Sequence, residues 1–356
     1  MKKTLITLIV LLLATSAIFA AGGKETEAKD EITVVFIPKI TGNAFFEAAN
    51  VGAQNYAAKI GFTVKYDGSP EASVANQVTI IDNAINSGAD AICVSSVDAT
   101  GLDSILKEAM KAGVKVVTWD SDVSGDARTV MVSQGTPEIL GKMLVDMLVE
   151  SLKERGKNPA VDAIKYVWHY SQATVTDQNS WRAAGEAYIK ESFPNWINVN
   201  PSNYYSEQDA EKAITIGEAI LMAHPDIDGI ICNDSTALPG QAQAAQNLKM
   251  DKNDVSITGF APPNSMKDYA RNGVIARWGL WDCQVQGALG CYLGYYLASG
   301  NEIKVGDKID VPEIGEIEVF PNTILDANAY TAPDSGVVLL PERVVFTTEN
   351  MDNYDF

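Results

Sequence analysis

The stretch ITVVFIP at residues 32–38 is an apolar run rich in β-branched residues, and it opens a regular alternation of apolar runs and helical stretches. The segments that follow are AFFEAANVGAQNYAAKI (44–60), FTVKYD (62–67), SVANQVTIIDNAINSG (73–88), ADAICVSS (89–96), GLDSILKEAMKAG (101–113) and VKVVTWD (114–120). Strands that are hydrophobic along their whole length indicate a parallel sheet covered by helices on both faces. Gly61, Gly88 and Gly113 stand where the helices need a left-handed cap. The segment therefore predicts a doubly wound α/β lobe.

The alternation starts again after the polar residues 121–128. The apolar runs of this second series are TVMVS (129–133), AIKYVW (163–168), DGIICND (228–234), VSITGF (255–260) and VIARWGLWD (274–282). Two arrays of similar size predict two doubly wound lobes rather than one very wide sheet. We assign residues 31–122 and 282–312 to the N-terminal lobe, and residues 123–281 and 313–356 to the C-terminal lobe.

Residues 1–21 have the three parts of a secretory signal peptide. Lys2 and Lys3 form a basic start, an apolar run from Leu5 to Leu13 follows, and small residues end the segment. The alternative is a permanent membrane anchor, but the run is short for a spanning helix and polar residues follow it directly. We expect cleavage near Ala20 and a periplasmic or otherwise exported mature protein.

The composition excludes several classes of function. The 356 residues are 46% apolar, which is too hydrophobic for a disordered chain, and the length suits two domains. Lys and Arg number 27 against 46 Asp and Glu, and the resulting net charge of -19 disfavours nucleic acid as a partner. His169 and His224 lie far apart in the sequence and the four cysteines form no CxxC pair. We therefore expect no metal site, no cofactor, and buried free thiols.

Polar side chains follow the apolar runs where the predicted strands end, which is the edge at which open parallel sheets bind ligands. The residues selected at these ends are Lys39, Asp120, Asp177, Gln178, Asp234 and Asp282. A carboxylate accepts from hydroxyl groups, an amide donates and accepts, and an ammonium donates. Phe45 and Phe46, in the first turn of the first predicted helix, would cover the apolar face of a ligand. Together these residues predict a small, largely preformed site for a polyhydroxylated molecule.

Each of these side chains also has a purely structural interpretation. An aspartate at a strand end commonly caps the next helix, and Lys39 could be a solvated loop lysine. Phe45 and Phe46 are adjacent and so point in different directions, which places at least one of them in the core. The argument rests on the set of residues and not on any one of them.

Sequence motifs of common enzymes are missing. No dinucleotide-binding glycine fingerprint, P-loop, nucleophile elbow or HExxH zinc motif occurs in the chain. A glycosidase with paired carboxylates stays open as an alternative, because Asp120 with Asp122, or Asp177 with Asp234, could meet across a cleft.

The chain resembles the type I periplasmic sugar-binding proteins and, among them, the autoinducer-2 receptors of ABC importers. The segments that carry this resemblance are FIPK (36–39), TWDSD (118–122), TVTDQN (174–179), ALPGQAQAAQNL (237–248) and the tail VVLLPERVVFTTENMDNYDF (337–356). The resemblance extends from about Ile32 to Phe356 and implies a transport receptor rather than an enzyme.

The resemblance also implies particular ligand contacts. Those of the first three segments fall on Lys39, Asp120, Asp177 and Gln178. The proline of the ALP segment is Pro239, and a family contact that is normally alanine falls on Gln241, which departs from the family pattern.

We therefore predict a monomeric receptor that captures autoinducer-2 in its non-borated tetrahydroxy-furan form, closes by a hinge movement, and delivers the ligand to an ABC permease of the inner membrane. Two alternatives stay open: a receptor for rhamnose or a pentose, favoured by the bulkier Gln241, and an exported carbohydrate-processing enzyme. A LacI-type regulator is disfavoured because no helix-turn-helix precedes the first strand.

Overall fold

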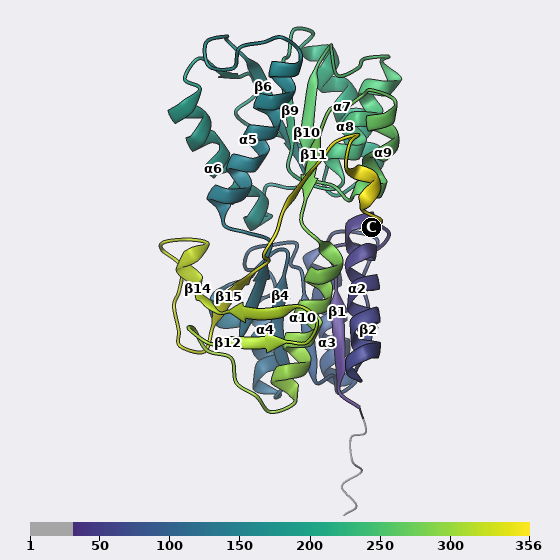
Figure 1. The fold of residues 1–356 in the computed structure, drawn as a ribbon. Coiled ribbons are helices and arrows are strands. Elements are labelled where there is room, and N and C mark those ends of the chain that lie inside the picture. The colour runs from purple at the N-terminus through teal and green to yellow at the C-terminus, as the bar shows by residue number, and fades with distance from the viewer. Residues whose placement is uncertain (1–30) are drawn as a thin grey trace, which may run out of the picture.

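The computed structural model describes residues 31–356, which form two α/β lobes stacked end to end (Figure 1). The predicted signal peptide and its cleavage site lie outside the described residues. The predicted fold class, two doubly wound lobes, is confirmed.

The N-terminal lobe is built on a seven-stranded sheet whose strands are parallel except for one edge strand. In spatial order the strands are β14 (Phe320–Pro321), β15 (Gly336–Leu339), β5 (Val130–Ser133), β4 (Lys115–Trp119), β3 (Ala91–Val94), β1 (Thr33–Ile37) and β2 (Thr63–Tyr66). The central strands β3 and β5 are buried at every position, as expected for strands covered on both faces.

Helices α2 (Ala44–Ile60) and α10 (Cys283–Ala298) pack side by side against this sheet. A Cβ atom at Gly52 would lie 2.1 Å from the backbone oxygen of Gln284, and one at Gly287 would lie 2.1 Å from that of Ala49. Only glycine permits this approach of the two helix backbones. Helices α3 (Val74–Asn86) and α4 (Asp103–Lys111) and the hairpin of β12 (Lys308–Val311) and β13 (Gly315–Glu318) complete the lobe.

The C-terminal lobe contains the strand order β10-β9-β6-β7, with β8 paired to β6 beyond the short β7. These strands are β10 (Ser256–Gly259), β9 (Gly229–Cys232), β6 (Lys165–Tyr170), β7 (Ile197–Asn198) and β8 (Tyr204–Tyr205). The antiparallel pair β11 (Trp278–Leu280) and β16 (Val344–Phe346) lies beside β10. The helices are α5 (Pro137–Glu154), α6 (Thr176–Ser192), α7 (Ala210–Ala223), α8 (Ala237–Asn247) and α9 (Pro263–Arg271).

The chain crosses between the lobes three times: from β5 to α5, from β11 to α10, and from β15 to β16. The boundaries predicted from the sequence differ from this arrangement. We expected the C-terminal lobe to begin at residue 123 and to include residues 313–356, but β5, β14 and β15 pair within the N-terminal sheet. An apolar run specifies a buried strand and does not specify which sheet it joins.

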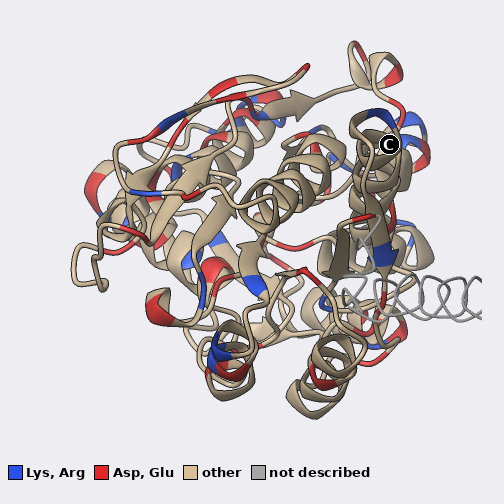
Figure 2. Ribbon diagram, turned by 90° about the horizontal axis from the view of Figure 1, so that it is seen from below, with Lys and Arg blue, Asp and Glu red and all other residues tan. Residues whose placement is uncertain are grey.

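Charged residues of both signs are spread over the lobes (Figure 2). Cys93, Cys232, Cys283 and Cys291 are free and buried, as predicted. Within residues 31–356, no helix is long and apolar enough to cross a membrane, and no group of three or more His, Cys, Asp or Glu side chains could hold a metal ion.

Candidate functional site

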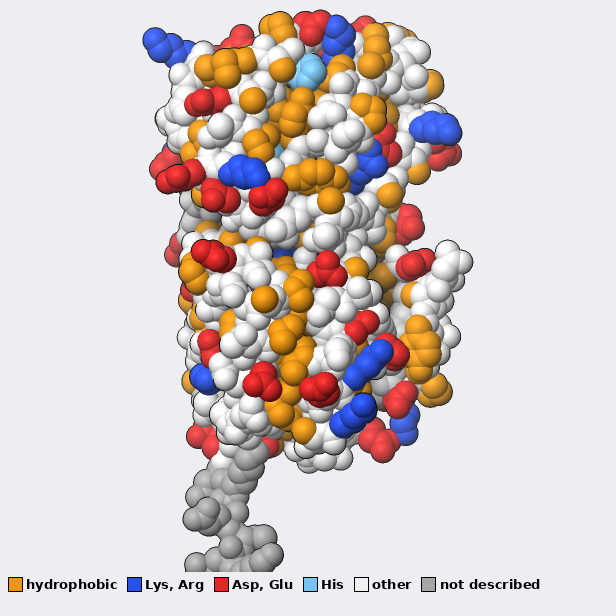
Figure 3. All heavy atoms as spheres, turned by 180° about the vertical axis from the view of Figure 1, so that it is seen from behind, with side chains coloured by type: hydrophobic (Ala, Val, Ile, Leu, Met, Phe, Trp, Pro, Cys, Tyr) orange, Lys and Arg blue, Asp and Glu red, His pale blue; other side chains and the backbone are white. Residues whose placement is uncertain are grey.

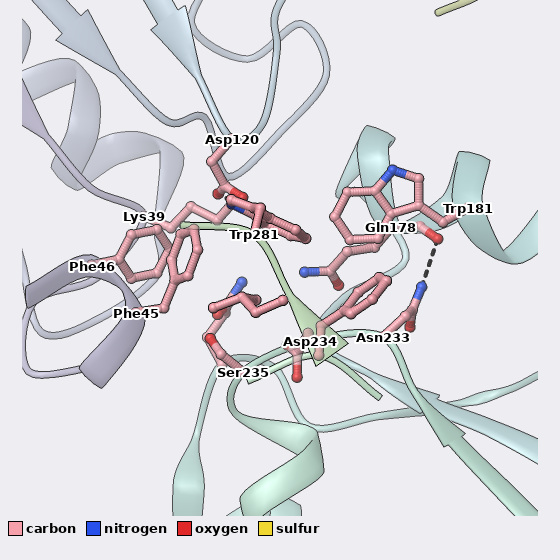
Figure 4. Close-up of a pocket in the computed structure, with 13 residues that line it drawn as sticks. Lys39, Phe45, Phe46, Asp120, Gln178, Trp181, Asn233, Asp234, Ser235 and Trp281 are labelled. Carbon is pink, nitrogen blue, oxygen red and sulfur yellow. Dashed lines mark hydrogen bonds and ion pairs between the residues drawn. The ribbon is translucent and has the colours of Figure 1, made fainter. Parts of the chain in front are cut away.

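A small pocket lies between the lobes, at the carboxyl ends of the parallel strands. Viewed from behind, the surface narrows to a waist between the lobes, and acidic side chains lie along both of its edges (Figure 3). The lining side chains nearly fill the pocket, which has a free volume of only about 30 Å³. The lining residues are Lys39, Phe45, Phe46, Asp120, Gln178, Trp181, Gln208, Asn233, Asp234, Ser235, Phe260, Leu280 and Trp281 (Figure 4).

Lys39 follows β1 and is the cation of the pocket, with only 2% of its side chain exposed. Its Nζ lies 3.0 Å from Asp120 Oδ2 and 3.9 Å from Asp177 Oδ1. Burial lowers the pKa of Lys39, but Asp120, Asp177 and Asp234 outweigh this effect, and the net shift of the pKa is upward. Lys39 is therefore an ammonium that donates hydrogen bonds.

Asp120 follows β4 and adopts a left-handed backbone conformation, with φ of +60°. The Ser121 N–H donates to the Trp119 carbonyl at 2.6 Å and closes a tight turn around Asp120. This turn directs the carboxylate toward Lys39 and toward Ser95, whose hydroxyl donates to Asp120 Oδ2 at 2.7 Å. Both partners belong to the N-terminal lobe, so this part of the site is built within one lobe.

Asp177, in the first turn of α6, reaches across the cleft to the other lobe. Its Oδ1 accepts from the Ser121 hydroxyl and faces Lys39, while its Oδ2 is buried without a hydrogen-bond partner. Burial raises the pKa of Asp177 to about 6, although Lys39 lowers it. Asp177 lines the wider part of the cleft, next to the pocket, together with Asp120 and Trp181.

Asn233 and Asp234 follow β9, on the C-terminal side of the pocket. Asp234 Oδ1 accepts from the backbone N–H groups of Thr236 and Ala237, and its Oδ2 is unpaired. Burial raises the pKa of Asp234 to about 6 against the effects of these hydrogen bonds and of Lys39. The Asn233 amide donates to the backbone oxygen of Gln178 at 2.8 Å, and Asn233 Oδ1 is unpaired.

Gln178 supplies a donor to the same side of the pocket. Its Oε1 accepts from the hydroxyl of Ser171 at 2.5 Å and is thereby fixed. The Nε2 atom, for which no hydrogen bond is formed within the described residues, is left for a ligand oxygen.

Aromatic rings line the rest of the pocket. Trp181 lies 5.9 Å from Trp281, Phe260 lies 5.5 Å from Trp281, and Phe45 lies 5.8 Å from Trp281, all centroid distances in edge-to-face arrangements. Ring faces of this kind cover the C–H surface of a sugar-like ligand while polar groups bind its oxygens.

A model of the periplasmic binding protein domain matches residues 34–302. The chain belongs to this family. A solved structure, LsrB from Clostridium saccharobutylicum in complex with AI-2, is 64% identical to this chain and has a TM-score of 0.91. The match covers 91% of this chain and 100% of the LsrB chain. The resemblance to type I periplasmic sugar-binding proteins, and to the autoinducer-2 receptors among them, is confirmed.

More distant members of the family bind sugars. The D-ribose/D-allose-binding protein of Pseudomonas aeruginosa is 23% identical over 74% of this chain and 81% of its own length. The D-apiose import binding protein of Paraburkholderia graminis is 27% identical over 73% of this chain and 78% of its own. A Clostridium phytofermentans solute-binding protein with bound L-rhamnose, at 21% identity and a TM-score of 0.81 over 91% of this chain and 98% of its own, shares the fold. This periplasmic binding protein thus groups with solute receptors and not with enzymes.

Four of the predicted contacts, Asp177, Pro239, Gln241 and Asp282, do not line the pocket, and of these only Asp177 borders the adjoining cleft. The Gln241 side chain points into the C-terminal lobe, where Oε1 lies 3.0 Å from His169 Nδ1 and Nε2 donates to the Gly217 carbonyl. Pro239, on the same helix, does not line the pocket. Asp282 is an exposed N-cap of α10 that accepts from the Val285 N–H at 3.1 Å.

Sequence reasoning also passed over several lining residues. Asn233 and Trp281 are not among them, because they stand just past the same strand runs as Asp234 and Asp282, where the pattern indicates ligand contacts. Gln208, Ser235 and Leu280 carry no comparable signal. Phe45 and Phe46 both line the pocket and are each only 3% exposed, which confirms that at least one belongs to the core.

The lobes also touch directly around the pocket. Asn43 Nδ2 donates to Thr236 Oγ1 at 3.1 Å, and the Ser235 hydroxyl donates to Asn43 Oδ1 at 3.2 Å. The Thr174 hydroxyl donates to the Val97 carbonyl at 3.3 Å. The described conformation is therefore a closed one.

Proposed function

We propose that this periplasmic binding protein is the receptor of an ABC importer and that it binds autoinducer-2 in the pocket between the lobes. The observation that carries the proposal is the polar set in and beside the pocket: one buried ammonium, a free amide donor, and three unpaired acceptor oxygens. Two of these oxygens belong to Asn233 and Asp234 in the pocket, and the third belongs to Asp177 in the adjoining cleft. The 64% identity to a protein solved in complex with AI-2 supports the same ligand.

The charges of the site favour a neutral ligand. Lys39 faces the carboxylates of Asp120, Asp177 and Asp234, so the fully ionised site carries more negative than positive charge. An anionic sugar would be repelled, whereas hydroxyl groups donate to the carboxylates and relieve their burial. Lys39 and Gln178 would donate to ring or hydroxyl oxygens.

Binding would shift the protein toward its closed form. Lys39 and Asp120 lie on one lobe, and Asp177, Gln178 and Asp234 on the other, so a ligand held by both sets has a higher affinity for the closed state. This differential affinity is the source of the hinge movement.

The sequence supports an exported receptor, which we propose is a monomer. Its first 21 residues have the pattern of a signal peptide cleaved near Ala20. The partners we propose are a small polyhydroxylated ligand and a permease of the inner membrane. The net charge of -19 speaks against nucleic acid.

Rhamnose or pentose binding was favoured by Gln241, but this side chain pairs with His169 outside the pocket and no longer supports that alternative. Isothermal titration with autoinducer-2, L-rhamnose and D-ribose tests the proposal. We expect saturable binding of autoinducer-2 and far weaker binding of the two sugars. Binding of L-rhamnose without binding of autoinducer-2 would keep the assignment as a receptor and refute the proposed ligand. Turnover of any glycoside in a panel would refute the assignment as a receptor.

A further inference from the structure

The three chain crossings between the lobes meet at one buried residue, Gln134. It directly follows β5 at the first crossing, and it is only 1% exposed. Its backbone oxygen accepts from Arg343 Nε, at the third crossing, at 2.6 Å. Its Oε1 accepts from Gln286 Nε2, on α10 just after the second crossing, at 3.0 Å.

The same two glutamines reach two residues that line the pocket. Gln134 Nε2 donates to the backbone oxygen of Asp120 at 3.0 Å. Gln286 Oε1 accepts from Trp281 Nε1 at 2.6 Å, and Gln286 Nε2 also donates to the Val132 carbonyl. A continuous buried chain of hydrogen bonds thus joins Asp120 to Trp281 through Gln134 and Gln286, and Figure 4 shows both ends at the pocket.

The Asp120 end of this chain is a strained part of the backbone. A left-handed conformation at a residue other than glycine persists only where the surroundings enforce it. The Gln134 amide binds the carbonyl of the turn at Asp120 and so opposes its relaxation to an extended conformation. Relaxation would move the carboxylate away from Lys39 and Ser95.

We propose that Gln134 and Gln286 are positioning residues that orient Asp120 and Trp281 for the ligand and couple both to the hinge. The inference rests on the proposed function, because ligand binding is its readout. Neither glutamine lines the pocket, so their effect on affinity passes through Asp120 and Trp281.

The test is the substitution Gln134→Glu, which keeps the size of the side chain and the acceptor for Gln286 but replaces the donor to Asp120 with an oxygen. We expect autoinducer-2 affinity to fall about tenfold, a typical coupling for residues in direct contact. The loss of affinity should disappear in the Asp120→Gly background, where neither the carboxylate nor the backbone strain is left to be controlled. It should persist in full in the Asp234→Asn background, since Asp234 lies on the other lobe. A purely structural role would give the same loss in both backgrounds.

Gln286→Met, which removes the acceptor of Trp281, provides a second variant and should cause a comparable loss. The inference is overturned if both variants bind as tightly as the unmodified protein, if the loss is equal in the two backgrounds, or if both variants fail to fold cooperatively in urea. Failure of the unmodified protein to bind autoinducer-2 would instead refute the proposed function.

Discussion

The two sides of the pocket differ in how far their polar groups are already paired. On the N-terminal side, Asp120 forms an ion pair with Lys39 and accepts a hydrogen bond from Ser95. On the C-terminal side, Asp177, Asn233 and Asp234 each have one buried acceptor oxygen without a partner. The N-terminal side is thus complete without a ligand, whereas the C-terminal side becomes complete only when hydroxyl groups donate to it.

This difference explains why closure would depend on the ligand. A buried polar atom without a partner costs about 1 to 3 kcal/mol, so the closed form with an empty pocket is disfavoured. An open form hydrates these oxygens, and a bound polyol replaces the water. The predictions below test this division between a preformed side and a side completed by the ligand.

Removal of the ammonium on the preformed side should have the largest effect. Lys39→Met leaves Asp120 and Asp177 without their cation, and breaking a buried ion pair in this way costs about 3 to 5 kcal/mol. We expect titration calorimetry to detect no binding of autoinducer-2 at micromolar concentrations. Binding within tenfold of the unmodified protein would show that the ammonium does not hold the ligand.

On the side completed by the ligand, Asp177→Ala should weaken binding by about 2 to 4 kcal/mol, or roughly 30- to 1000-fold. Asp234→Ala should weaken it less, because one oxygen of Asp234 already serves the turn before α8. Asp234→Ala should also lower the thermal midpoint through loss of that cap. The reverse order of affinities would contradict the roles given to the two carboxylates.

Acid should weaken binding through the same two carboxylates. Their pKa values are raised to about 6 from 3.8, so their contribution to the stability of the closed, empty form is present below pH 4 and is lost as the pH rises through 6. A ligand that donates hydroxyls favours the ionised groups and reverses this dependence. We expect affinity to fall between pH 7 and pH 5 by at most about tenfold for one carboxyl and about 100-fold for two, the limits reached when the free protein keeps both carboxyls as buried as in the closed form.

Titrations in buffers of different ionisation enthalpy would measure the proton release that accompanies this effect. Asp177→Ala should retain the pH dependence of one group only. Affinity that is constant from pH 7 to pH 5 would contradict a raised pKa of these carboxyls in the ligand-free protein.

The smallest effect should come from Asp282→Ala, outside the pocket. Loss of this N-cap should destabilise the fold by about 1 kcal/mol and leave autoinducer-2 affinity unchanged. Thermal unfolding and titration of the same sample check both statements. A drop in affinity of more than threefold would show that Asp282 contributes to ligand binding.

Much of the fold was predictable from the sequence because its physical causes are local. Continuous apolar runs specified buried parallel strands, and Gly61, Gly88 and Gly113 do adopt positive φ after their helices. The lobe boundaries were wrong because the pairing of β5 and β15 with the first sheet depends on contacts distant in the sequence.

The candidate site was likewise predictable where it depends on local sequence and unpredictable where it depends on packing. Lys39, Asp120 and Asp234 line the pocket because strand ends converge there, whereas Gln178 reaches it from the first turn of α6. Pro239 and Gln241 were chosen by a motif within a helix, and a motif does not specify which face of the helix meets the ligand. Trp181 lies one turn beyond Asp177 on α6, and its role depends on the packing of that helix against the cleft.

Small-angle X-ray scattering with and without saturating autoinducer-2 tests most directly whether a shared ligand completes the C-terminal side and closes the lobes. We expect the radius of gyration to fall on addition of the ligand to the unmodified protein and to stay unchanged for Asp177→Ala at the same concentration. A radius of gyration that is equal with and without ligand, at a concentration where calorimetry shows full binding, would contradict closure by the ligand.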